Sequence, residues 1–239
     1  AHGLAYASQK YNGGAYPLVY RKYDLLGRLV VTQDESGHQS SFTIDSLGWR
    51  RGASDPDQGS LSFAFDDSGK LTAQTDAKGQ TVYFTYDAAG RLQTKDYGGG
   101  ATVSYFYDVS GYGASKGKRT RSYDSRTGIT KAQYYDGLGR PSTSRWTIDG
   151  VSYDVSQGYD ASGRPSTVTY PDGEAVTTGY DAGGRVYSVA GTSTYVSSLT
   201  YKSQGQLDTV SLGNGVSVTH GYNENRGWLT SKQASNGSV

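Results

Sequence analysis

The sequence predicts an all-β protein, a continuous antiparallel β-hairpin ribbon of 21-residue repeats curling into a spiral or shell segment. A glycine-closed turn recurs about every 21 residues, a second turn follows roughly midway, and apolar and polar residues alternate in between. No window shows the period of a helix. A length of 239 residues therefore indicates one array of repeats rather than separate globular domains.

The repeated turn can be followed through its glycine. Successive copies lie 21, 21, 21, 21, 28, 24, 21, 21 and 22 residues apart. The ten glycines are Gly27, Gly48, Gly69, Gly90, Gly111, Gly139, Gly163, Gly184, Gly205 and Gly227. A feature repeated this often is far more commonly architecture than an active site.

The residues around each glycine suit a hairpin loop closed by a bulge. An aspartate at the first turn position accepts hydrogen bonds from the turn's amides, and glycine at the fourth adopts the left-handed conformation. An aromatic residue precedes that position in nine of ten copies, and a base follows the glycine in six. The best-preserved copies supply the structural repeat motif: Tyr23, Asp24, Gly27, Arg28, Tyr86, Asp87, Gly90, Arg91, Tyr135, Asp136, Gly139, Arg140, Tyr159, Asp160, Gly163, Arg164, Tyr180, Asp181, Gly184 and Arg185.

Hairpin geometry predicts which side chains face one another. Asp87 should lie across from Arg91, and Tyr86 across from Leu92 on the opposite face. Leu, Ile, Val and Phe make up only about 16% of the chain, whereas there are 22 tyrosines and 34 glycines. We therefore expect a thin sheet, wet on both faces, whose tyrosines stack between neighbouring strands with their hydroxyls near water.

Composition restricts the function. The net charge of +1 gives no support for binding nucleic acid or an anionic membrane, and no apolar run approaches the length that spans a bilayer. There is no cysteine, which fits either redox compartment, and no signal-peptide pattern. Methionine is absent even at residue 1, so we expect a piece of a longer chain. We divide it into a flanking strand region (1–22), the repeat array (23–229) and a tail (230–239).

The motifs "YDLLGRL" (23–29), "YDAAGRL" (86–92), "YDGLGRP" (135–141), "YDASGRP" (159–165) and "YDAGGRV" (180–186) resemble the YD-repeat, or Rhs (rearrangement hotspot), family. That family includes shell-forming subunits of insecticidal toxin complexes, bacterial Rhs effectors, wall-associated proteins and animal teneurins. The resemblance covers about residues 23–229. It implies a spiralling β-sheet that closes into a hollow shell, often around a toxic polypeptide.

The sequence departs from the full family pattern. It shows no aspartate-rich self-cleavage core and no variable toxin domain, so we expect no cargo enclosed by this segment alone. About twenty strands at ~4.8 Å spacing give a contour of only ~100 Å, an arc rather than a sealed container. The implied partners are the remaining repeats of the same shell or a cargo polypeptide.

Sharper site hypotheses are weak. The histidines His2, His38 and His220 are scattered and carry no catalytic motif. Residues 55–59, "DPDQG", space acids as part of a calcium loop does, but they also fit the second-turn position. The clusters 98–100 and 183–184 lack the helix and Lys-Ser/Thr of a phosphate loop. We expect no enzyme activity, cofactor or metal.

Two irregularities leave alternatives open. The 28-residue unit between Tyr107 and Tyr135 carries the bases Lys116, Lys118, Arg119, Arg121 and Arg126, which indicates an extended or protruding hairpin, either solvated or in contact with an acidic partner. Paired units of 42 residues would also suit five propeller blades, although no 42-residue super-period appears.

The leading functional hypothesis is a structural shell segment that encapsulates, scaffolds or displays a toxin or other polypeptide, secreted or at a bacterial cell surface. The alternative is an extracellular adhesin or glycan-binding module, because exposed tyrosines could stack on sugar rings.

Overall fold

A computed structural model describes residues 5–9 and 18–236, and His2 lies outside them. In these residues the chain forms 21 strands, with no helix long and apolar enough to cross a membrane. The first ten strands are β1 Ala5–Gln9, β2 Leu18–Tyr23, β3 Leu29–Gln33, β4 Gln39–Ile44, β5 Arg50–Asp55, β6 Gly59–Phe65, β7 Leu71–Thr75, β8 Thr81–Tyr86, β9 Leu92–Asp96 and β10 Thr102–Tyr107. The other eleven are β11 Arg119–Asp124, β12 Ile129–Tyr135, β13 Pro141–Ile148, β14 Val151–Tyr159, β15 Pro165–Thr169, β16 Ala175–Tyr180, β17 Val186–Ala190, β18 Thr194–Tyr201, β19 Leu207–Leu212, β20 Val216–Tyr222 and β21 Leu229–Asn236.

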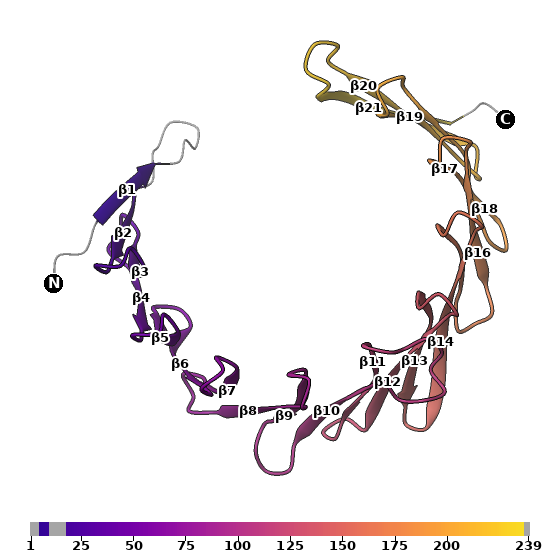
Figure 1. Ribbon diagram of the computed structural model, residues 1–239. Helices are drawn as coiled ribbons and strands as arrows, with labels where there is room; N and C mark the ends of the chain where they lie inside the picture. Colours follow the sequence, from indigo (N-terminus) through magenta and orange to yellow (C-terminus); the bar gives the residue numbers. More distant parts are fainter. Residues whose placement is uncertain (1–4, 10–17, 237–239) are drawn as a thin grey trace. The chain divides into compact units, whose positions relative to one another are not determined.

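The strands form two units, residues 1–105 with 123–127 and residues 106–122 with 128–239. In the first unit β1 to β10 pair in chain order, each antiparallel to the next. In the second unit β12 to β21 do the same (Figure 1). The predicted antiparallel hairpin ribbon is confirmed. Four-stranded propeller blades are excluded, because each of these ladders continues through ten strands.

The repeated turn has the predicted hydrogen-bond pattern. In the copy after β8 the Asp87 amide donates to the Arg91 carbonyl at 2.9 Å, and the Gly90 amide donates to the Asp87 carbonyl at 2.8 Å. Gly90 has a φ of +78°, the left-handed conformation that glycine adopts without steric cost. Tyr86 faces Leu92 after a register shift at the end of the strand, as expected for a bulge.

The second turns are also confirmed. The Gly37 amide donates to the Asp34 carbonyl at 3.2 Å, in the same arrangement as the main turn. In the "DPDQG" segment the Asp55 carboxylate accepts the amides of Asp57 and Gln58, so this acid closes its own turn. The three consecutive glycines at 98–100 form a hairpin turn between β9 and β10, each with a positive φ.

The ribbon is one layer thick. The accessible surface is 15426 Å², whereas a compact monomer of 25.6 kDa exposes about 10,400 Å². Among the described residues only Ala132, Ser115 and Thr120 are buried. In β8 the burial alternates along the strand, with Phe84 and Tyr86 half-buried and Tyr83 exposed, as the sequence predicts. The aromatic residues of the motif therefore pack within the sheet and not beneath a second one.

The long unit corrects one assignment. The turn after Tyr107 closes where the Asp108 amide donates to the Lys118 carbonyl, so Gly117 and Lys118, not Gly111, occupy the glycine and base positions. Six extra residues lengthen this turn, so the hairpin is extended, as we expected, but it does not protrude.

The lengthened turn folds onto the following repeat. Tyr112 stacks on Tyr134 with ring centroids 4.8 Å apart, and the Tyr135 amide donates to the Tyr112 carbonyl at 3.0 Å. A Cβ on Gly113 would lie 1.8 Å from the Tyr135 carbonyl oxygen. Only glycine permits this approach, so the turn cannot lie against the strand if residue 113 carries a side chain.

Three glycine-to-alanine variants separate strain from crowding. Gly113→Ala combines a φ of +75° with the clash, Gly173→Ala has a φ of +92° with open space around it, and Gly137→Ala has neither. We expect Gly173→Ala to lower the unfolding free energy by about 1–2 kcal/mol. Gly113→Ala should cost more, and Gly137→Ala close to nothing. Urea melts check the order, and equal losses for all three would refute the assigned conformations.

Candidate functional site: the ladder of repeat turns

The turns of successive repeats are joined by a ladder of charged and aromatic side chains. Its first contact lies within one repeat, where the base after the glycine bonds the aspartate that opens the turn. Arg91 Nε donates to Asp87 Oδ2 at 2.7 Å, and Arg140 makes the same bond to Asp136. The pairs Arg28–Asp24, Arg164–Asp160 and Arg185–Asp181 repeat it. The predicted pairing is thus present in all five of the best-preserved copies.

The second contact joins one repeat to the next. The guanidinium carbon of Arg140 lies 4.1 Å from the ring centroid of Tyr159, and that of Arg164 lies 4.2 Å from Tyr180. Arg185 lies over Tyr201 at 4.8 Å. We expected the base and the aromatic residues to occupy opposite faces, and this is wrong. The bulge breaks strict alternation at the turn, and the long arginine side chain extends to the next hairpin.

The third contact comes from the tyrosine hydroxyl. Tyr86 Oη donates to the carbonyl of Leu71 at 2.8 Å, and Tyr201 Oη to that of Val186 at 2.7 Å. Tyr135, Tyr159, Tyr180 and Tyr222 make equivalent bonds to the preceding repeat. These hydroxyls are therefore bonded to the backbone and not left to water, which corrects our expectation. Tyr159, Tyr180 and Tyr201 therefore each contact the preceding repeat twice: the ring packs against its arginine, and the hydroxyl donates to a carbonyl of its strand.

The ladder survives where its sequence changes. Trp49 replaces the base in the second copy and packs on Phe65 at 5.7 Å, while Arg51 takes over the bond to Asp45 at 2.6 Å. In the ninth copy, Gln206 donates to the Gly227 carbonyl at 2.8 Å.

Lys118 serves the long unit. Its Nζ lies 4.7 Å from the Tyr135 centroid and donates to the carbonyl of Gly139. Sequence reasoning missed this base and the roles of Arg51 and Gln206. The dipeptide Gly117-Lys118, which matches Gly90-Arg91, could have revealed the first of these.

The turn carboxylates are held in their charged form. The pKa of Asp160 lies below its ordinary value of 3.8 because the Arg164 amide and then the Arg164 guanidinium donate to it, although desolvation opposes this. The pKa of His38 is raised by its hydrogen bond to Asp34, with 2.8 Å between Nδ1 and Oδ2. His220 lies elsewhere, 3.3 Å from the Asp208 carbonyl oxygen. Within 5–9 and 18–236, no three His, Cys, Asp or Glu side chains are arranged to hold a metal ion.

The fold and the ladder together define the class of protein: a repeat protein made of one β-sheet layer, in which side-chain contacts join the turn of each hairpin to the next. The RHS repeat model matches residues 65–102 and 159–195. The resemblance to the YD/RHS-repeat family seen in the sequence is confirmed for these two segments.

Solved structures share the fold. A Photorhabdus luminescens Tc holotoxin pore matches with a TM-score of 0.79 and 18% identity over 96% of this chain. The TcdB2-TccC3 crystal structure matches with 0.79 and 18% over 95%, and TcdB2-TccC3 without its hypervariable C-terminal region with 0.80 and 18% over 95%. This chain spans only 13% of each of those chains. No curated protein matches.

Arg164 allows the ladder to be measured. A double-mutant cycle of Arg164→Ala with Tyr180→Leu should give a coupling of about 0.5–1 kcal/mol. The cycle of Arg164→Ala with Asp160→Ala should give a coupling free energy of about 0.2–1 kcal/mol, because the Arg164–Asp160 ion pair is partly exposed. Lys78→Ala, on an exposed turn outside the ladder, is the control. Additive urea melts for Arg164 and Tyr180 would contradict the proposed contact.

Acid stability follows from the aspartate pKa. Asp160 binds a proton more readily in the unfolded state, so its stabilisation is complete above pH 3.8 and is lost as pH falls through the lower folded pKa. Asp160→Asn should therefore show a shallower loss of stability between about pH 4 and pH 2 than the parent. Asparagine keeps the turn, since Asn223 accepts the amides of Asn225 and Arg226 at its own turn. Parallel profiles in acid denaturation would refute the claim.

Proposed function

We propose that this chain is a segment of a protein shell wall, which encapsulates, scaffolds or displays another polypeptide and catalyses no reaction. The observation that carries the proposal is the single layer joined by a repeating ladder. A single layer whose repeats are joined along their whole length can extend as a partition. The structural likeness to Tc toxin chains supports a shell role in general.

In this proposal the array at 23–229 forms the wall, and the twenty motif residues stabilise it. The partners are other repeats of the same shell and a polypeptide held against it. The location is outside the bacterial cytoplasm, secreted or at the cell surface. The absence of cysteine is compatible with this, because the ladder supplies the cross-links.

Limited trypsin digestion of the natural polypeptide that carries these repeats tests the proposal. We expect the repeat array and the polypeptide that it shields to survive trypsin concentrations that degrade both after unfolding in urea. The double variant Arg140→Ala with Arg164→Ala removes the base from two adjacent ladder contacts. Trypsin should then cut the shielded polypeptide faster than it does in the parent, whereas Lys78→Ala should leave the rate of cutting unchanged. If trypsin cuts every segment outside the array equally fast in the parent and in the double variant, the proposed wall function is wrong.

A further inference from the structure

One face of β12, β13 and β14 carries an exposed aromatic row. Lys131 lies opposite Trp146, and Trp146 lies opposite Tyr153, so the three side chains share a face. Trp146 is 38% exposed and Tyr153 45%, and Lys131 Nζ lies 3.7 Å from the Trp146 ring centroid. Exposed aromatic pairs of this kind are enriched at binding surfaces.

Beside the aromatic row, two residues further along each strand, runs a row of shorter side chains on the same face. Gln133 lies opposite Ser144, and Ser144 lies opposite Val155. Two cavities open along this row and share Gln133 and Ser144. The row is therefore the floor of a groove that crosses the strands beside the aromatic row, and Lys131 of the aromatic row lines the first cavity.

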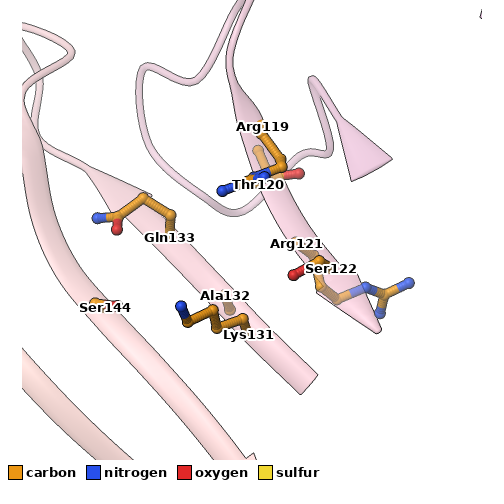
Figure 2. Close-up of a pocket in the computed structure, with 8 residues that line it drawn as sticks. All are labelled: Arg119, Thr120, Arg121, Ser122, Lys131, Ala132, Gln133 and Ser144. Carbon is orange, nitrogen blue, oxygen red and sulfur yellow. The ribbon is translucent and has the colours of Figure 1, made fainter. Parts of the chain in front are cut away.

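The first cavity, about 100 Å³, is basic and polar. Lys131 and Gln133 line it from β12 and Arg119 from β11, and no carboxylate lines it (Figure 2). Arg121 also borders this cavity, but its guanidinium extends to the other side, over Phe106 at 4.1 Å. The charge that a ligand meets here comes from Lys131 and Arg119.

The second cavity, about 230 Å³, differs in character. It has no charged lining residue, and Pro141, Val155 and Val168 line it together with the uncharged polar residues Gln133, Ser142, Thr143, Ser144 and Gln157. An aliphatic side chain can pack against the proline and the two valines.

We propose that this groove binds an extended acidic peptide, with a carboxylate in the cavity at Lys131 and an aliphatic side chain in the cavity at Val155. Side chains two residues apart in an extended chain lie on the same face, so residues i and i+2 of the peptide enter the two cavities. The aromatic row packs along the peptide backbone. This binding site is independent of the wall function, which needs only the ladder.

Fluorescence anisotropy with a labelled peptide, Glu-Ser-Leu-Ser-Glu-Ser-Leu, which puts Glu and Leu on one face, tests the proposal on the whole chain. We expect saturable binding that weakens with salt and exceeds that of the matched Gln-Leu and Lys-Leu peptides, in which Gln or Lys replaces each Glu. Lys131→Gln and Trp146→Ala should each weaken binding by about tenfold. Ser144→Tyr, which fills the floor but keeps every charge, should abolish it. Tyr187→Ala, an equally exposed tyrosine elsewhere (48%), should bind as the parent does.

Thermal melts of each variant establish that the fold is retained, and Ser144→Tyr and Lys131→Gln provide independent readings if Trp146→Ala unfolds. No saturable binding at millimolar peptide would overturn the proposal. So would equal binding of the Gln-Leu peptide, because the carboxylate would then play no part. Binding of an oligogalacturonate in place of the peptide, with the same dependence on Trp146, would assign the groove to acidic sugars instead.

Discussion

A sheet that is one layer thick has no interior, and every other property of this chain follows from that constraint. Without a core, apolar burial cannot supply most of the stability, so the hairpins must hold one another through their edges and turns. The contact of a base with the next tyrosine does this. Each such contact is worth only about 0.5–1 kcal/mol at an exposed site, but it recurs along the array, and each repeat is stabilised mainly by its neighbours.

The ladder depends on a side chain long enough to contact the next turn, and not on a particular charge. Arginine, lysine and glutamine all extend from one turn to the next, and Trp49 fills the same space with an aromatic ring while Arg51 restores the ion pair. Such tolerance explains why only six of ten copies carry a base directly after the sequence-assigned glycine. Hydrogen bonds to main-chain carbonyls are insensitive to the neighbour's side chain, so adjacent repeats can diverge without losing register.

The spacing of glycine and aspartate was sufficient to predict the strands, the turns and the pairing of Tyr86 with Leu92, because these depend on local geometry. Contacts between repeats were not predictable in the same way. Strict alternation places Arg140 away from the tyrosines, and only the bulge and the length of its side chain bring it over Tyr159. Gly117 was missed because six inserted residues hide its equivalence to Gly90. The groove beside Trp146 depends on the register of three strands, which the sequence does not reveal.

In both ten-strand ladders each described strand pairs with its neighbours in the chain, which has a consequence for how the protein forms. The ladder contacts between repeats join residues 15 to 21 positions apart, as in Tyr86 with Leu71 and Lys118 with Gly139. Contacts of such short sequence separation cost little loop-closure entropy. A repeat leaving the ribosome therefore finds its docking surface already assembled in the repeat before it. Synthesis can extend the ribbon one hairpin at a time, without waiting for any distant part of the chain.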